Sequence, residues 1–191
     1  MSPTGKVFLA KLRWELDPFS TLTLPGYHEI LVRQSERFPF GRKGNVLAGL
    51  WTELERTGCD GVIINDNDVI IDPHDHRTMM IAVQTDPTSV WTAPVKIWPH
   101  STQDKSWSWC HGEHQGTRNQ VDTDNPTWFG FGFTFLPARL LDASIAAGLA
   151  EWAYPWVDTK VGEMARSMEI GVRVVRNGCT PKHINFCHWQ S

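Results

Sequence analysis

The 191-residue sequence lacks the features that mark several large classes of protein. No apolar run approaches the ~20 residues needed to cross a bilayer, and residues 1–6 lack the long apolar core of a signal peptide. The net charge of -3 offers no basic surface for sequence-independent binding of nucleic acid. None of the four cysteines forms a C-x-x-C pair, which favours free thiols over a zinc ribbon or redox motif. We therefore expect a cytoplasmic protein without a membrane span.

The composition is that of a globular protein with an excess of tryptophan. Hydrophobic residues make up 41% of the chain and charged residues 20%, and the length suits one domain with a substantial core. No internal repeat, low-complexity tract or linker divides the sequence. Five of the ten tryptophans flank or lie within a polar middle segment, where flat aromatic faces could receive sugar rings or bases: Trp91, Trp98, Trp107, Trp109 and Trp128.

The most informative stretch joins two apolar runs through a pair of aspartates. The run 62–64 (Val-Ile-Ile) predicts a buried strand, and a second run, 69–71, follows Asp66 and Asp68. Ionised carboxylates are very costly to bury alone, so two of them at the end of a strand need a solvent-facing cleft or a cation. In an open α/β sheet the carboxyl ends of the strands are where ligands bind. The pattern therefore predicts a divalent-metal site at this edge of the sheet.

Hydrophobic periodicity predicts alternating strands and helices. The predicted strands are 6–14, 29–33, 60–71, 89–98 (edge or broken, because of Pro94), 128–136 and 172–175. The predicted helices are 45–57, capped by Asn45 and ended by Gly58; 76–83; 137–152; and one from Asp158 to Gly171. Loops are expected at 16–27 and 38–44, and a long polar loop at 100–125. The order strand, helix, strand over 29–71 predicts a parallel pair with a right-handed crossover.

Together these segments resemble the GT-A glycosyltransferases, the nucleotide-diphospho-sugar transferases. The similar segments cover about two thirds of the chain in the same order: 43–45 (Lys-Gly-Asn), 61–73 with the D-x-D, 129–133 (Phe-Gly-Phe-Gly-Phe), 156–159 (Trp-Val-Asp-Thr) and 181–183 (Pro-Lys-His). The resemblance implies a single-domain α/β fold with a mixed, mostly parallel, Rossmann-related sheet flanked by helices. Residues 1–73 would bind the nucleotide-sugar, and 74–191 would form the acceptor half with a mobile loop at about 100–126.

The implied activity is metal-dependent transfer of a sugar from a UDP- or GDP-type donor to an acceptor hydroxyl on a glycan, protein or modified nucleobase. Mn²⁺ or Mg²⁺ would stabilise the leaving diphosphate, and such cations prefer carboxylate oxygens. Asp68 is the predicted direct ligand. Asp66 would be a second ligand or hold the ribose, with Asn67 beside it. His183 would complete the metal shell through a nitrogen, which suits Mn²⁺ better than Mg²⁺.

Further roles follow from the same resemblance. Asp158 would be the general base of a single inverting displacement, although an aspartate at a helix start is also a plain N-cap. Arg42 and Lys43 could balance the diphosphate charge, although a solvated basic loop is the stronger explanation of these two residues. The predicted acceptor side consists of Trp107, Trp109, Trp128, Gly130 and Gly132.

Two other functions stay open. A short N-terminal region leaves the nucleotide base without a named partner, which is compatible with a GT-A-like module that binds a nucleotide-sugar or glycan without turnover. The histidine clusters, 74–76 and 110–114, suggest a metal-dependent hydrolase. Against a hydrolase, no H-E-x-x-H pattern is present and His74 and His76 are not spaced i, i+4, so surface polar residues that open a helix are the stronger explanation of both.

Overall fold

The structure is a computed structural model. It describes residues 7–14, 31–32, 44, 47–49, 51–52, 58–66, 69–97, 108–109, 111–112, 123–124, 126–152 and 157–183. For 7–14, 31–32, 96–97, 108–109, 111–112 and 183 only the backbone is described. The predicted loop at 16–27 lies outside these residues, as does most of the loop at 38–44.

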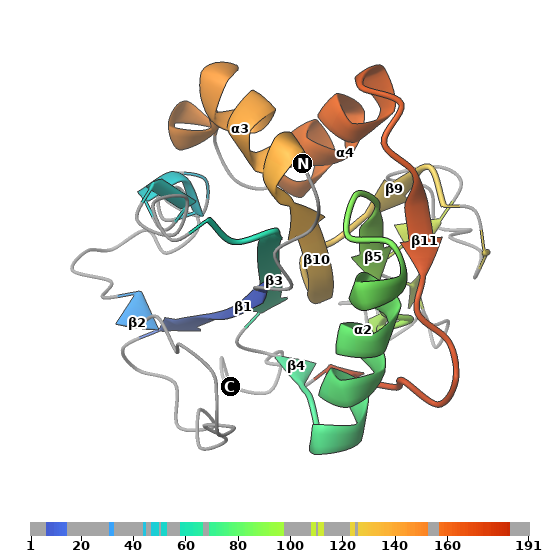
Figure 1. Ribbon diagram of the computed structural model, residues 1–191. Helices are drawn as coiled ribbons and strands as arrows, with labels where there is room; N and C mark the ends of the chain where they lie inside the picture. Colours follow the sequence, from blue (N-terminus) through green and yellow to red (C-terminus); the bar gives the residue numbers. More distant parts are fainter. Residues whose placement is uncertain are drawn as a thin grey trace, which may run out of the picture.

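A six-stranded mixed sheet in the order β11-β5-β10-β3-β1-β2 forms the centre of the molecule (Figure 1). Its strands are β1 Val7–Trp14, β2 Leu31–Val32, β3 Gly61–Asp66, β5 Val90–Thr92, β10 Phe133–Pro137 and β11 Val172–Val174. β1 runs parallel to β2 and β3, and β5 runs parallel to β11. β10 runs antiparallel to both of its neighbours, β3 and β5. The predicted mixed α/β architecture is therefore confirmed.

Helices flank the sheet. They are α2 Pro73–Thr85, α3 Ala138–Ala146, the short 3-10 helix η2 Leu149–Glu151 and α4 Val157–Ser167. A further helix precedes β3, and its described residues are 44, 47–49 and 51–52. In Figure 1, α3 and α4 lie together, whereas α2 lies apart from them beside β5.

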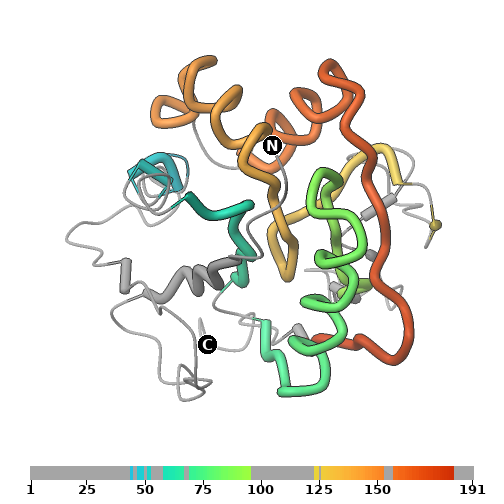
Figure 2. Tube along the Cα trace, in the orientation of Figure 1, coloured from blue at the N-terminus to red at the C-terminus, as the bar shows by residue number. Residues whose placement is uncertain are grey.

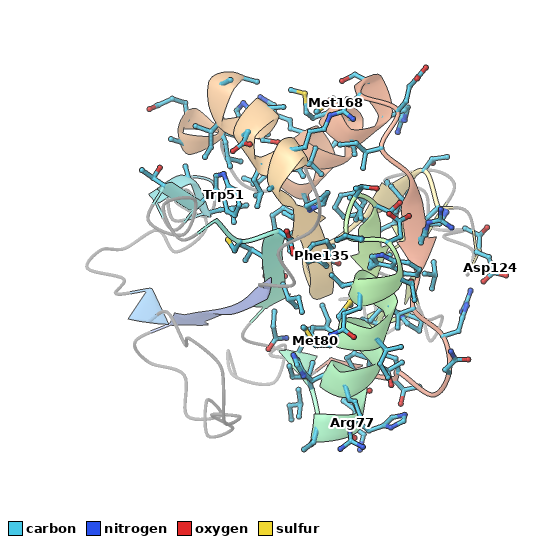
Figure 3. The ribbon with its side chains drawn as sticks, viewed as in Figure 1. Trp51, Arg77, Met80, Asp124, Phe135 and Met168 are labelled. Atoms are coloured by element: carbon cyan, nitrogen blue, oxygen red, sulfur yellow. The ribbon has the colours of Figure 1, made fainter. Side chains whose placement is uncertain are left out.

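Side chains of β3 alternate between two apolar clusters, as the period of a strand requires. Val62 and Ile64 belong to the first cluster, with the helix at 44–52, α3 and α4. Ile63 belongs to the second cluster, with β10, α2 and the run 69–71. Figure 3 shows Trp51 and Met168 on the α3–α4 side of Phe135 and Met80 on the α2 side. The sheet is thus covered by helices on both faces.

A second, four-stranded sheet has the order β4-β12-β6-β7. Its strands are β4 Val69–Ile70, β6 Lys96–Ile97, β7 Ser108–Trp109 and β12 Lys182–His183, and a separate two-stranded ladder joins β8 His111–Gly112 to β9 Trp128–Phe129. Figure 2 follows the chain from β3 through β4 into α2. Because β12 lies between β4 and β6, the second sheet brings the end of the described chain to the segment that follows the D-x-D.

Several predicted strands differ in extent from those observed. The predicted strand 60–71 is two strands in different sheets, β3 and β4, and 128–136 is β9 and β10 with a bend at 130–132. The segment 100–125 is not structureless, because β7 and β8 within it pair with β6 and β9. Pro94 separates β5 from β6, as the prediction of a broken strand requires. The tail adds β12, which periodicity did not predict.

Helix ends also differ from prediction. Gly44 is already helical, so Asn45 is not the N-cap, and α4 begins at Val157, so Asp158 lies in its first turn. α3 ends at Ala146 instead of continuing to 152, because the chain turns through Gly148 at φ 91°. Gly58 has φ 67°, the left-handed geometry expected of a glycine that ends a helix, while residues 53–57 lie outside the described residues. Among the described residues, no helix is long and apolar enough to cross a membrane.

Candidate functional site

The carboxyl end of β3 is held by the side chain of Asn65, which is fully buried. Its Nδ2 donates to the carbonyl of Val69 at 3.0 Å and to that of Gly132 at 3.1 Å. The backbone N–H of Asp66 donates to the same Gly132 carbonyl at 3.2 Å. The start of β4 and the bend before β10 are thereby tied to the end of β3.

Sequence reasoning gave Asn65 no role. The signal was present, since a polar residue directly after Val-Ile-Ile sits in a strand that is otherwise buried. Buried amides are almost always hydrogen-bonded, so such a residue predicts a specific partner. The identity of that partner, a carbonyl 67 positions away, has no local signature.

The predicted metal ligands are only partly within the described residues. Asp66 is half-buried at the end of β3. Asn67 and Asp68 lie outside the described residues, as do Arg42, Lys43 and Trp107. In the described part of the chain, no three His, Cys, Asp or Glu side chains gather as a metal site. The metal site therefore stays a prediction.

The strand β12 brings His183 to this end of β3. β12 pairs antiparallel with β4, and His183 lies opposite Val69 in the register. Residues that face each other across an antiparallel pair have Cα atoms about 4.5–5.5 Å apart. Val69 directly follows Asp68 in the sequence. The backbone of His183 therefore lies opposite the residue that directly follows Asp68.

A buried aspartate at the start of α2 anchors the segment that leads into β12. Asp75 is 3% exposed, and its Oδ1 accepts the N–H of Thr180 at 2.7 Å. Its Oδ2 accepts the N–H of Asp72 at 3.0 Å, while Asp72 Oδ1 accepts the N–H groups of His74 and Asp75. These bonds form a capping box, so polar residues do open this helix as predicted.

Several titratable groups near α2 have pKa values shifted from their ordinary range. Hydrogen bonding from the Asp75 N–H, opposed in part by desolvation, lowers the pKa of Asp72 below its usual value. Burial raises the pKa of the Cys179 thiol to about 12, with the charges of Asp75 and Asp72 adding to the effect, so this thiol is protonated and not a nucleophile. Burial lowers the pKa of His76 to about 4. Asp72 and Asp75 are engaged in capping the helix and anchoring the tail.

The glycine-rich bend at 130–132 is packed against the end of β3. Gly130 and Gly132 are both buried. The Thr134 hydroxyl donates to the Gly130 carbonyl at 2.8 Å, and the Thr92 hydroxyl therefore donates to that of Thr134 at 2.9 Å. Hydroxyl and amide side chains from the sheet thus hold the carbonyls of both glycines. These glycines shape the bend beside Asp66 and present no exposed surface of their own.

Asp158 lies on a helix that packs against the predicted acceptor side. It is half-buried in the first turn of α4, and its Oδ1 accepts the N–H of Thr159 at 2.8 Å. α4 packs on β9, where Gly162 lies close to the Phe129 ring. Trp128, on the same strand, is half-buried. Of the predicted acceptor-side tryptophans, Trp109 is described only as backbone, in β7.

Comparisons with known proteins assign no family to the chain. No protein-family model matches the sequence, and no curated protein matches it. Among solved structures, the chain is similar to the crystal structure of A197 from STIV, with 11% sequence identity and a TM-score of 0.49 over 88% of this chain and 80% of that chain.

Proposed function

We propose that the chain is a metal-dependent glycosyltransferase of the GT-A type, which moves a sugar from a nucleotide-diphosphate donor to an acceptor hydroxyl. The observation that supports this proposal best is the pairing of β12 with β4, which sets His183 opposite Val69. A D-x-D and a C-terminal histidine form one metal site only if the tail returns to the strand that follows the D-x-D. The pairing provides that return.

The residues at this end of the sheet fit a divalent cation by the chemistry of their donors. Asp66 and Asp68 offer carboxylate oxygens, and His183 offers an imidazole nitrogen, a mixed set that suits Mn²⁺ better than Mg²⁺. When bound, such an ion would supply Lewis-acid stabilisation of the charge that develops on the leaving diphosphate. Arg42 and Lys43 would balance the remaining negative charge of the donor.

The proposed transfer is a single displacement. The acceptor oxygen forms a bond to the anomeric carbon while the bond from that carbon to the diphosphate oxygen breaks, and the electron pair leaves with the diphosphate. Asp158 takes the proton of the acceptor hydroxyl, a contribution of ~10²–10⁴-fold for a well-placed base. Its position in the first turn of α4 favours a negatively charged side chain before the proton is taken.

The packing of α4 on β9 supports the roles proposed for Asp158 and Trp128. α4 lies on β9, so the helix that carries Asp158 is fixed to the strand that carries Trp128. The bend that follows β9 contacts Asp66 through the Gly132 carbonyl. The segment 128–132 therefore connects the strand on which α4 packs with the bend that binds Asp66, which supports a proposal that sets donor and acceptor on either side of it.

Nucleotide binding tests the proposal. We expect UDP or GDP to bind the wild-type chain tightly only when Mn²⁺ is present, as measured by calorimetric titration with each nucleotide. Since changing residues that merely support metal ligands costs about 10–100-fold in metal affinity, the loss of a direct ligand in Asp68→Ala should cost about 100-fold or more. Glu163→Ala, at an exposed position of α4, is the control and should bind like the wild type.

The same titrations distinguish the other functions. If Asp68→Ala keeps both nucleotide binding and turnover, the proposed site is wrong. Metal-dependent nucleotide binding without any release of sugar from the donor would instead identify a binding module. Metal binding that is lost only in His74→Ala or His111→Ala would identify a hydrolase built on the histidine clusters.

A further inference from the structure

Asn65 makes more connections between chain segments than its place in a buried strand requires. Its side chain is fully buried, and both of its N–H groups are used, one on the Val69 carbonyl and one on the Gly132 carbonyl. These two carbonyls belong to the start of β4 and to the bend before β10. A single amide nitrogen therefore joins three segments of the chain.

The chemistry of the site selects asparagine. Two carbonyl oxygens, each an acceptor, converge on one nitrogen, so the side chain must supply two donors from a single atom. Aspartate, which has nearly the same shape, supplies none when ionised. An apolar residue would leave both carbonyls without these bonds. Among the described residues, Oδ1 of Asn65 is buried and has no hydrogen-bond partner. Both hydrogen bonds of this side chain are therefore donated by Nδ2, and this nitrogen is the reason that an amide is favoured here.

These connections flank the proposed metal ligands on both sides. Asp66 follows Asn65 directly, and its own N–H is held by the Gly132 carbonyl that Nδ2 also binds. Val69 follows Asp68 directly and pairs with His183. The Asn65 amide thus binds the residue that follows the D-x-D segment, Val69, and the bend that binds its first residue, Asp66.

We propose that Asn65 is the positioning residue of the D-x-D segment. Its amide fixes where the segment begins and ends, and thereby sets the spacing between Asp66, Asp68 and His183. The consequence for metal binding rests on the proposed function, whereas the consequence for local structure can be measured in the protein alone.

Hydrogen exchange tests the positioning directly. In Asn65→Asp the carboxyl donates one hydrogen bond at most when protonated and none when ionised, so the bend should loosen and the Asp66 amide should exchange about tenfold faster or more at neutral pH. The Ile63 amide, deeper in β3, should keep its protection. Ile64→Ala, which removes apolar packing from the same strand without touching the amide, is the matched control and should not selectively expose Asp66.

A pH series separates positioning from a general packing defect. The carboxyl introduced by Asn65→Asp can donate one hydrogen bond once it is protonated, so the excess exchange at Asp66, after correction for intrinsic rates, should shrink as the pH falls. Asn65→Leu has a similar size and no donor, so its defect should not recover. If Asn65→Asp does not fold, Asn65→Ser, which keeps one donor, should show an intermediate exchange rate at Asp66.

The consequence for metal binding is measured in a separate experiment, with Mn²⁺ and UDP or GDP as probes. If the wild type binds them, Asn65→Asp should weaken binding about tenfold or more at neutral pH and recover in part at lower pH. A wild type that binds neither probe, together with pH-dependent exchange at Asp66, would overturn the proposed function and leave the positioning role supported. Unchanged exchange at Asp66 in Asn65→Asp and Asn65→Leu would overturn the positioning role whatever the metal does.

Discussion

The two ends of β3 are closed in different ways. At the amino end, Gly61 leaves no room for a side chain: a Cβ there would meet the Leu136 carbonyl and would lie 2.6 Å from the Phe135 ring. At the carboxyl end, Asn65 and Asp66 are tied by hydrogen bonds to Gly132 and Val69. The first closure is steric and apolar, and the second is polar and directional.

The difference separates the parts of the molecule that make the fold from those that make the site. Close packing at Gly61 sets β10 against β3 and does not involve a titratable group. The polar end is joined to β4 and to the bend before β10 by the Asn65 amide, and β12, which pairs with β4, follows a segment held by the Asp75 carboxylate. Changes at the amino end should therefore act on global stability, and changes at the carboxyl end should act locally and with pH.

The largest effect is expected for Gly61→Ala. The added methyl group must displace the Leu136 carbonyl, which is backbone within the central sheet, so we expect a loss of about 3 kcal/mol in the free energy of unfolding. Urea unfolding followed by tryptophan fluorescence would measure it. Gly49→Ala, in the first helix with nothing within 4 Å of the new methyl group, should stabilise the protein by about 0.5–1 kcal/mol. A Gly61→Ala variant as stable as the wild type would contradict the steric closure.

The sequence predicts the steric parts of the molecule well. The apolar runs 62–64 and 69–71, the helix before Gly58 and the aromatic run at 129–135 follow from side-chain periodicity, because the spacing of apolar residues within each segment is a local feature of the sequence. From these runs alternating strands and helices could be predicted, and the mixed sheet flanked by helices was what the family resemblance implied. The order of the strands across the sheet depends on pairings between distant segments and could not.

The polar connections were not predictable from periodicity. The run 128–136 looked like one strand, but Thr134 and Asn65 bind the carbonyls of Gly130 and Gly132 and shape a bend there. The tail at 181–183 has no strand-like pattern in the sequence. In the structure it pairs with β4 as β12, directly after Thr180, whose N–H donates to the Asp75 carboxylate. Hydrogen bonds from side chains to distant backbone groups produce no periodic pattern in the sequence. The resemblance could therefore suggest the candidate residues, but their arrangement in space could not be predicted.

A smaller effect is expected for Asp75→Ala, which removes the anchor of the tail. Two hydrogen bonds to a buried carboxylate are lost, from Thr180 and Asp72, so we expect a loss of about 2 kcal/mol in the free energy of unfolding. Amide exchange should rise at His183 more than in β3. Asp124→Ala removes an exposed ion pair with Arg176, and such pairs contribute about 0–1 kcal/mol, so this control should change little. Equal exchange at His183 in both variants would show that β12 does not depend on Asp75.

The smallest effect is the pH dependence contributed by His76 in the first turn of α2, the helix whose Asp75 anchors the segment that leads into β12. Burial lowers its pKa to about 4 in the folded protein, whereas an unfolded histidine titrates near 6.5. As the pH falls below about 6.5 the unfolded chain binds the proton first, so this histidine lowers stability progressively until the pH reaches about 4. The ring is only half-buried, so solvent limits the size of the effect.

His76→Gln removes this titration. The difference in melting temperature between His76→Gln and the wild type should be constant above pH 7 and should shift in favour of the variant between about pH 6.5 and 4. The difference between Gly61→Ala and the wild type should stay constant over the same range, because no titratable group faces the added methyl group among the atoms nearest to it. If both differences change alike with pH, the pH dependence does not come from His76.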